Sequence, residues 1–261
     1  MARIFITGSA DGLGQLAARK LVAVGHDVVL HGRNRDRAQQ ALRAVPGARI
    51  ALEGDLASIE QTRALARQAN AAGPFQAVIH NAGVYRPGAA RQETVDGLDD
   101  VFAINALAPY LLTALIDRPQ RLIYLTSGLH QGGDPDLRDL QFGRRRWSGS
   151  QAYANSKLFD VVLAFAVARL WPHVLSNAVD PGWMPTKMGG PSAPGDLEQG
   201  VATQVWLAVS DERGASVTGR YFYHMRTQAA HRAASDVSIQ NGFLAACEQL
   251  TGVRLASAVM K

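Results

Sequence analysis

Short runs of apolar residues alternate with longer amphipathic stretches through the first 180 residues of the chain. The short runs predict strands near residues 3–7, 27–31, 48–53, 75–81, 121–127, 173–179 and 219–223. The amphipathic stretches predict helices near residues 13–24, 35–44, 58–72, 97–116 and 151–170. Strands that alternate with helices are typical of βαβ units, whose parallel strands are covered on both faces. The pattern therefore predicts an α/β fold with a doubly wound parallel sheet.

Two segments show neither a helical nor a strand period. Residues 128–150 and 183–200 are rich in Gly, Pro, Asp and Arg. Long irregular segments inside a compact domain commonly carry function, so we expect both to contact the substrate. No repeat, low-complexity tract or linker divides the sequence, and residues 1–261 are expected to form a single domain.

Charge and cysteine content narrow the classes of partner. The 261 residues include 27 Lys and Arg against 22 Asp and Glu, a net charge of +5. The basic residues are scattered, which argues against a nucleic-acid partner. The single cysteine, Cys247, excludes an internal disulfide and a thiolate metal cluster, so we expect no metal and a cytoplasmic location. The longest all-apolar stretch, residues 161–168, is far shorter than the ~20 residues of a membrane span.

A glycine-rich turn, Thr7-Gly-Ser-Ala-Asp-Gly-Leu-Gly14, follows the first predicted strand and opens the first helix. Its second half also fits the G-x-G-x-x-A fingerprint of dinucleotide sites. Glycines let the backbone approach a pyrophosphate, and the helix N-terminus offers free N–H groups to it. We therefore expect cofactor contacts from Gly8, Ser9, Gly12, Leu13 and Gly14.

The end of the second predicted strand lacks the acidic residue that NAD sites use to bind ribose hydroxyls. The strand leads instead to His31-Gly32-Arg33-Asn34. An arginine at this place can pair with a 2′-phosphate, so Arg33 predicts a preference for NADP(H) over NAD(H). The alternative is an ordinary surface arginine.

Tyr153 and Lys157 are four residues apart near the start of a predicted helix, so both side chains can meet one ligand. A nearby ammonium group favours the phenolate, and we expect Lys157 to lower the pKa of Tyr153 from about 10. Ser127 ends a predicted central strand, at the sheet edge where α/β folds bind ligands. Its hydroxyl group can polarise a carbonyl.

With these motifs in order, the chain resembles the short-chain dehydrogenase/reductase family of Rossmann-fold enzymes over roughly residues 3–190. The matching motifs are the glycine turn, Gly54-Asp55-Leu56, Asn81-Ala82-Gly83, Asn105, Ser127, Tyr153-Ala-Asn-Ser-Lys157 and Asp180-Pro181-Gly182 leading to Thr186. The resemblance implies an oxidoreductase that interconverts a carbonyl and an alcohol.

The resemblance also implies a role for each matching residue. Tyr153 would be the general acid in reduction or the base in oxidation, and Ser127 would orient the substrate oxygen. Lys157 would lower the pKa of the tyrosine and hold the nicotinamide ribose, while Asn105 would position a water of a proton relay. For Asn81 and Asn105, local backbone hydrogen bonding is an equal alternative. The remaining cofactor contacts would be Asp55, Leu56, Asn81, Ala82, Gly83, Pro181, Gly182 and Thr186.

The separation of Ser127 and Tyr153, 26 positions, is about twice the usual spacing in the family and resembles that of retinol-dehydrogenase-like members. The extra residues carry Trp147, and the second irregular segment carries Trp183 and Met188. These large side chains predict a pocket for a bulky apolar small molecule. We expect His130 to be a loop residue without catalytic role, and residues 183–200 to form a mobile lid.

The sequence also distinguishes the predicted oxidoreductase from other classes of protein. A serine hydrolase would need G-x-S-x-G, which the chain lacks. An epimerase of the nucleotide-sugar branch would resemble a different glycine spacing and carry a larger C-terminal domain. The remaining alternative is a non-catalytic NADP-binding redox sensor or scaffold, which would be expected to lose Tyr153 or Lys157. A homodimer stays an open alternative beside the small-molecule substrate.

Overall fold

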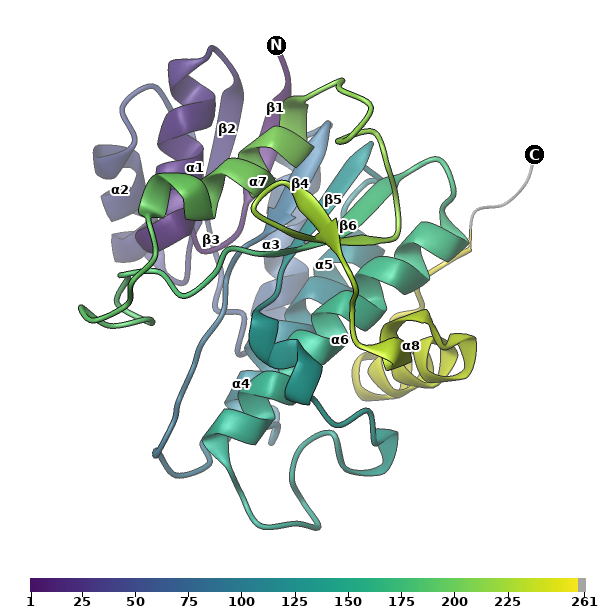
Figure 1. Ribbon diagram of the computed structural model, residues 1–261. Coiled ribbons are helices and arrows are strands. Elements are labelled where there is room, and N and C mark those ends of the chain that lie inside the picture. Colours follow the sequence, from purple (N-terminus) through teal and green to yellow (C-terminus); the bar gives the residue numbers. More distant parts are fainter. Residues whose placement is uncertain (258–261) are drawn as a thin grey trace.

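A computed structural model describes residues 1–257 of the chain (Figure 1). Its eight strands form one sheet in the order β3-β2-β1-β4-β5-β6-β7-β8. Seven strands are parallel and β8 runs antiparallel to β7. The strands are β1 (Arg3–Ile6), β2 (Asp27–Gly32), β3 (Ile50–Glu53), β4 (Ala77–His80), β5 (Arg121–Leu125), β6 (Leu175–Asp180), β7 (Arg220–Tyr223) and β8 (Arg226–Gln228). The predicted doubly wound sheet is confirmed.

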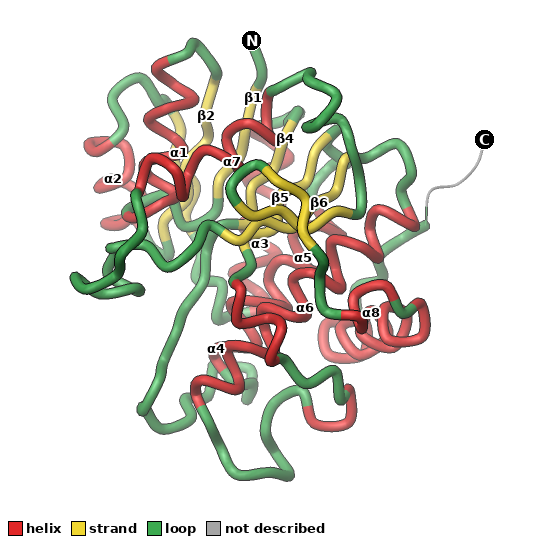
Figure 2. Tube along the Cα trace, viewed as in Figure 1, coloured by secondary structure: helices red, strands yellow, loops and turns green. Residues whose placement is uncertain are grey.

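Helices cover both faces of this sheet (Figure 2). The main helices are α1 (Gly12–Ala23), α2 (Arg35–Ala44), α3 (Ile59–Ala72), α5 (Ala108–Leu115), α6 (Gly149–Leu170), α7 (Leu197–Val209) and α8 (Val237–Thr251). The shorter ones are α4 (Asp100–Phe102), the π turn η1 (Ala103–Leu107), and the 3₁₀ turns η2 (Gly128–Gly132), η3 (Leu137–Asp139) and η4 (Arg232–Ser235).

The sheet has an apolar core on each face, because successive side chains of a strand point to opposite faces. In β1, Ile4 and Ile6 belong to the core under α1, α2 and α7, whereas Phe5 belongs to the core under α3, α5 and α6. All three are fully buried. Helix α8 then packs against the outside of α6, where Phe243 stacks on Phe159 with ring centroids 4.7 Å apart. Helix α6, which carries Tyr153 and Lys157, is therefore held between the sheet and α8.

Several predicted elements differ from the structure. The helix expected near residues 97–116 begins at Asp100 and is interrupted by the π turn η1. Residues 183–200 are irregular only to Asp196, because α7 begins at Leu197. Strand β8 and helices α7 and α8 were not predicted. At the start of α3, Ser58 accepts the N–H of Gln61, and the Gln61 side chain accepts the N–H of Asp55.

The long loops gather at the carboxyl end of the parallel strands, at the lower end of the views in Figures 1 and 2. This is the edge at which open α/β sheets bind ligands. Among residues 1–257, no helix is both long and apolar enough to cross a membrane.

Candidate active site

A cavity of about 750 Å³ opens at the carboxyl edge of the sheet, a volume within the usual range for small-molecule and cofactor sites. It is lined by the turn after β1, the ends of β2 and β4, the start of α6 and the segment after β6. Predicted site residues that line it are Gly8, Gly12, Leu13, Arg33, Asp55, Leu56, Asn81, Ala82, Gly83, Tyr153, Lys157, Pro181, Thr186 and Met188.

The glycine turn has the backbone of a ligand cradle. Gly8 and Gly12 have φ values of +63° and +56°, which L side chains rarely adopt. A Cβ on Gly14 would lie 2.4 Å from Nδ2 of Asn81, which donates hydrogen bonds to the carbonyls of Thr7 and Gly8. Asn81 thus ties the end of β4 to the turn. These contacts leave the turn open toward the cavity and fit a pyrophosphate there.

His31 organises the same turn from behind, a role that the sequence did not indicate. Its Nδ1 accepts the N–H of Gly8 at 2.9 Å, and its Nε2 lies 2.9 Å from the carbonyl of Gly54. Its backbone N–H donates to the Ser9 hydroxyl, so Ser9 is turned toward the sheet rather than the cavity. Burial lowers the pKa of His31 to about 4, which keeps the ring neutral and able to accept from Gly8.

Basic side chains surround the rim of the cavity beyond β2. Arg33 is exposed and lines the cavity, and no ion pair engages it within the described part of the chain. Arg37 lies four residues further on, in α2, with Nη2 2.6 Å from the Asp11 carboxylate. Lys187 reaches the same Asp11 oxygen at 3.0 Å. Arg37, Asp11 and Lys187 were not predicted, because they come from three different elements.

Tyr153 and Lys157 lie on the first turns of α6, with Lys157 Nζ 5.8 Å from the tyrosine ring centroid. Burial raises the pKa of Tyr153, while Lys157 and, more weakly, Ser127 lower it. The net shift is upward, so the expected lowering by Lys157 is present but burial outweighs it. Tyr85 packs against the phenol ring with centroids 4.6 Å apart. The phenol is therefore a protonated group at the cavity wall.

Asn105 sits in the π turn η1 and is fully buried. Its Oδ1 accepts the N–H of Val84, and its Nδ2 donates to the Val84 carbonyl and to the Ser156 hydroxyl. The side chain therefore joins the segment after β4 to α6. Its amide group is occupied by protein partners, as the backbone-bonding alternative described. π turns often occur at functional sites.

Ser127 caps the turn η2 at the end of β5, where its hydroxyl accepts the N–H of Leu129. His130 is fully buried and lies 2.8 Å from the Ser127 carbonyl through Nδ1, while Nε2 accepts the N–H of His231. Its ring also packs on Tyr221. His130 therefore fastens the Ser127 turn to the C-terminal segment.

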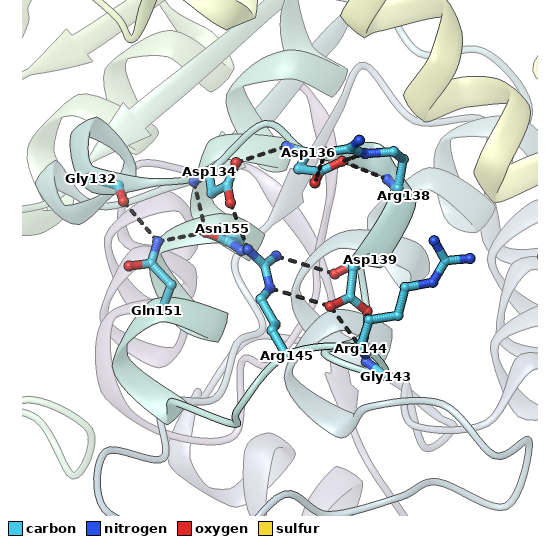
Figure 3. A network of polar contacts seen from close by, with 10 residues as sticks. All are labelled: Gly132, Asp134, Asp136, Arg138, Asp139, Gly143, Arg144, Arg145, Gln151 and Asn155. Atoms are coloured by element: carbon cyan, nitrogen blue, oxygen red, sulfur yellow. Dashed lines mark hydrogen bonds and ion pairs between the residues drawn. The ribbon is translucent and has the colours of Figure 1, made fainter.

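Arg145 bridges two acidic residues of the loop between Ser127 and α6 (Figure 3). Arg145 Nη1 lies 2.6 Å from the Asp134 carboxylate and Nε lies 3.4 Å from that of Asp139. The guanidinium also lies 4.4 Å from the Phe142 ring centroid. Asp134 in turn donates its N–H to Asn155 on α6. Arg145, the middle one of three consecutive arginines, thus fixes the loop.

The predicted substrate residues occupy different places. Met188 lines the cavity, with Sδ 3.9 Å from the Tyr153 hydroxyl. Trp147 packs on the small cluster that contains Phe142 and Tyr153, and its indole N–H donates to the Ala89 carbonyl. Trp183 is 58% exposed, and its indole N–H donates to Gly189 within its own segment. Predicted residues outside the cavity lining are Ser9, Gly14, Asn105, Ser127, Trp147, Gly182 and Trp183.

Known proteins are similar to this sequence over nearly its whole length. A family model described as short chain dehydrogenase matches residues 2–119. The chain is 44% identical to an uncharacterized oxidoreductase of Emericella nidulans, over 97% of this chain and 98% of that protein. It is 42% identical to the short-chain dehydrogenase chry4 of Gibberella zeae, over 98% and 100%. Retinol dehydrogenase 13 of Homo sapiens is 27% identical, over 97% and 86%.

Solved structures extend the likeness to the fold. An uncharacterized protein of Mycobacterium paratuberculosis is similar with a TM-score of 0.83 and 26% identity, over 98% of this chain and 95% of that chain. A blue fluorescent protein from a metagenomic library, solved with NADPH, has a TM-score of 0.69 and 24% identity, over 85% and 95%. With the glycine turn and the Tyr153 helix at one sheet edge, these likenesses show that the chain belongs to the short-chain dehydrogenase family of NAD(P)-dependent oxidoreductases.

Proposed function

We propose that the chain interconverts a ketone or aldehyde and the corresponding alcohol with NADP(H), on a bulky apolar small molecule. One observation carries this proposal. The protonated phenol of Tyr153 lines the same cavity as the glycine turn, so a proton donor lies at the edge where a dinucleotide fits. Cofactor and substrate would then share one domain, residues 1–261.

The roles of the protein groups follow from their positions. The bound nicotinamide supplies the hydride in reduction and accepts it in oxidation. Ser127 lies outside the cavity lining, but its hydroxyl is close enough to the phenol to lower the pKa of Tyr153, and from there it would orient the carbonyl oxygen. Tyr153 would transfer its hydroxyl proton to that oxygen as the alcohol forms. Lys157 holds a positive charge beside the phenolate that is left, and Asn105 keeps the segment after β4 against α6. In oxidation Tyr153 accepts the proton instead.

The NADP(H) preference rests on the rim beyond β2. Arg33 lines the cavity without an ion-pair partner among residues 1–257, and Arg37 faces the same rim. An arginine fork binds a phosphate through two hydrogen bonds, whereas a ribose hydroxyl needs an acceptor. Asp55, Leu56 and Ala57 form the neighbouring wall, where an adenine fits. The NADPH complex of the metagenomic blue fluorescent protein is compatible with this assignment.

The substrate class rests on the side chains around the phenol. Tyr85, Phe142 and Trp147 pack with Tyr153 in one small apolar cluster, and Met188 covers its hydroxyl. Such a surface favours an apolar molecule whose single polar group is the reacting oxygen. The likeness to retinol dehydrogenase 13 supports a substrate of this kind.

The decisive test is turnover of NADPH and NADH with a panel of aldehydes and ketones of increasing size. We expect Tyr153→Phe to lower kcat by about 10²- to 10⁴-fold with little change in cofactor Kd, because it removes a proton and little binding surface. A Phe variant that keeps more than about a tenth of the activity contradicts the role of Tyr153.

The same experiment distinguishes the proposed enzyme from the competing function. A non-catalytic NADP-binding sensor or scaffold would bind cofactor with the same Kd and turn over no carbonyl compound, with or without Tyr153. The presence of both Tyr153 and Lys157 at the cavity favours the enzyme.

A further inference from the structure

Lys157 is half of a buried ion pair. Its Nζ lies 2.7 Å from Oδ2 of Asp160, three residues further along α6, and the two side chains are 4% and 3% exposed. The same Nζ donates to the carbonyl of Leu125 at the end of β5, also at 2.7 Å. Two acceptors from different elements therefore fix the ammonium group, and one of them carries a full negative charge.

The surroundings of Asp160 offer it no other cation among the described contacts. Behind it, burial and, less strongly, Asp160 raise the pKa of Tyr124 on β5, which stays neutral. The Tyr124 hydroxyl bonds to Thr113 at 2.8 Å, and Thr113 lies 3.2 Å from His80 on β4, whose pKa burial lowers to about 3. The charge of Asp160 is thus matched by Lys157.

The charges of this pair and several groups on neighbouring elements shift the pKa of Tyr153. Burial raises its pKa most, Lys157 lowers it, and Asp160 raises it again. From the end of β5 the Ser127 hydroxyl lowers it, and from the end of β6 the carboxylate of Asp180 raises it. One cation therefore lowers the pKa of the buried phenol while two carboxylates raise it, and the neutral phenol is favoured.

The charged state of the pair follows from its contacts. Burial raises the pKa of Asp160 to about 6 despite the opposing effect of Lys157, so the carboxylate is ionised above that pH. Burial alone lowers the pKa of Lys157, but Asp160 and Tyr153 bring it above the ordinary value. Near neutral pH the pair is therefore an ammonium and a carboxylate.

We propose that Asp160 is a positioning residue that holds Lys157 in place and offsets its charge, so that Tyr153 rests protonated and acts as the proton donor of carbonyl reduction near neutral pH. This inference rests on the proposed function and adds a direction to it. Oxidation of the alcohol requires the phenolate as base, so it becomes efficient only in alkaline solution.

The first test measures the phenol without any turnover. Tyrosinate formation in the free protein is followed by ultraviolet difference titration, and the Tyr153→Phe spectrum is subtracted to isolate Tyr153. We expect Asp160→Asn to move its inflection down by about one pH unit, because one of the two carboxylates is removed. An inflection that stays in place or moves up overturns the inference.

A second test uses activity. The lower inflection of kcat/KM for alcohol oxidation should move by the same shift in Asp160→Asn, giving about tenfold more oxidation below that inflection. Asp160→Glu keeps a carboxylate at this position and should therefore show the wild-type pH profile of kcat/KM. Asp99→Asn is the control, since Asp99 is also buried but caps α4 through the Phe102 N–H. A profile that Asp99→Asn moves equally contradicts a role for Asp160.

Wild-type protein, with only Tyr153→Phe as the reference, provides the arm that leaves the ion pair intact, because removing one partner of a buried ion pair can unfold a domain. We expect the Tyr153 inflection of the wild type at or above the ordinary value of about 10, and one below about pH 8 overturns the inference. If no carbonyl compound is turned over, the proposed function fails while the ultraviolet titration still decides the role of Asp160.

Discussion

At the scale of single residues, we expect Arg33 to decide which cofactor binds more tightly. Arg33→Ala should narrow the preference for NADPH over NADH, because a charge-assisted contact is worth ~1.5–3 kcal/mol, or roughly 10- to 150-fold in Kd. Binding titrations of both cofactors measure this. Arg35→Ala is the matched control, since Arg35 lies two residues further on at the start of α2, is largely exposed and does not line the cavity. Equal Kd values in the wild type would contradict the assignment.

Residues that share a motif could be predicted, and residues that meet through the fold could not. Tyr153 and Lys157 are four positions apart, so their common face follows from helical geometry alone. His31 meets Gly8 and Gly54 only because β2 lies between β1 and β3 in the sheet. Asp11 likewise meets Arg37 and Lys187 from separate elements. Strand order decides such contacts, and the sequence does not contain it explicitly.

At the scale of elements, the missed helices did carry terminal signals. Asp196 caps α7 through the Gln199 N–H, and α8 lies between a capping Asp236 and the left-handed Gly252. Strand β8 had no such signal. Its hairpin turns at His224 and Met225, both with positive φ, where Asn-Gly would be usual. The π turn also could not be predicted, because its contacts to Val84 are tertiary.

The segment of residues 183–196 is expected to act as a lid. Met188 now lies against the Tyr153 hydroxyl, where the substrate oxygen must bind, so the segment has to rearrange. Its exposed Lys187–Asp11 pair contributes little to holding it closed. We expect hydrogen exchange here to slow when NADP⁺ and a substrate analogue bind, while β6 remains unchanged. High protection that is equal in both states would contradict a mobile lid.

At the scale of the whole molecule, buried neutral histidines couple folding to pH. Burial lowers the pKa of His80 from 6.5 to about 3. Below about pH 6.5, His80 therefore binds a proton in the unfolded chain but not in the folded chain. The contribution of neutral His80 to the free energy of unfolding is lost as pH falls toward 3. Between pH 7 and pH 5 the loss is about 2 kcal/mol.

His80→Gln should remove this pH dependence. The variant loses packing at every pH, but its deficit in the free energy of unfolding relative to wild type should shrink by about 2 kcal/mol at pH 5. Denaturant titrations at the two pH values measure the difference. Buried acids such as Asp99, whose pKa burial raises to about 6, are present in both the wild type and the variant. Their contributions therefore cancel in the difference between the two free energies of unfolding. A deficit that is the same at both pH values would contradict the buried neutral state of His80.

The arginine that fixes the loop before α6 has a consequence for how the substrate range of this scaffold could be changed. Because Arg145 joins Asp134 and Asp139 and stacks on Phe142, the loop backbone is set before any substrate arrives. New specificities can then be designed by exchanging side chains such as Trp147 on a backbone that stays in place. A designer who instead replaces Arg145 would alter the backbone that carries Trp147.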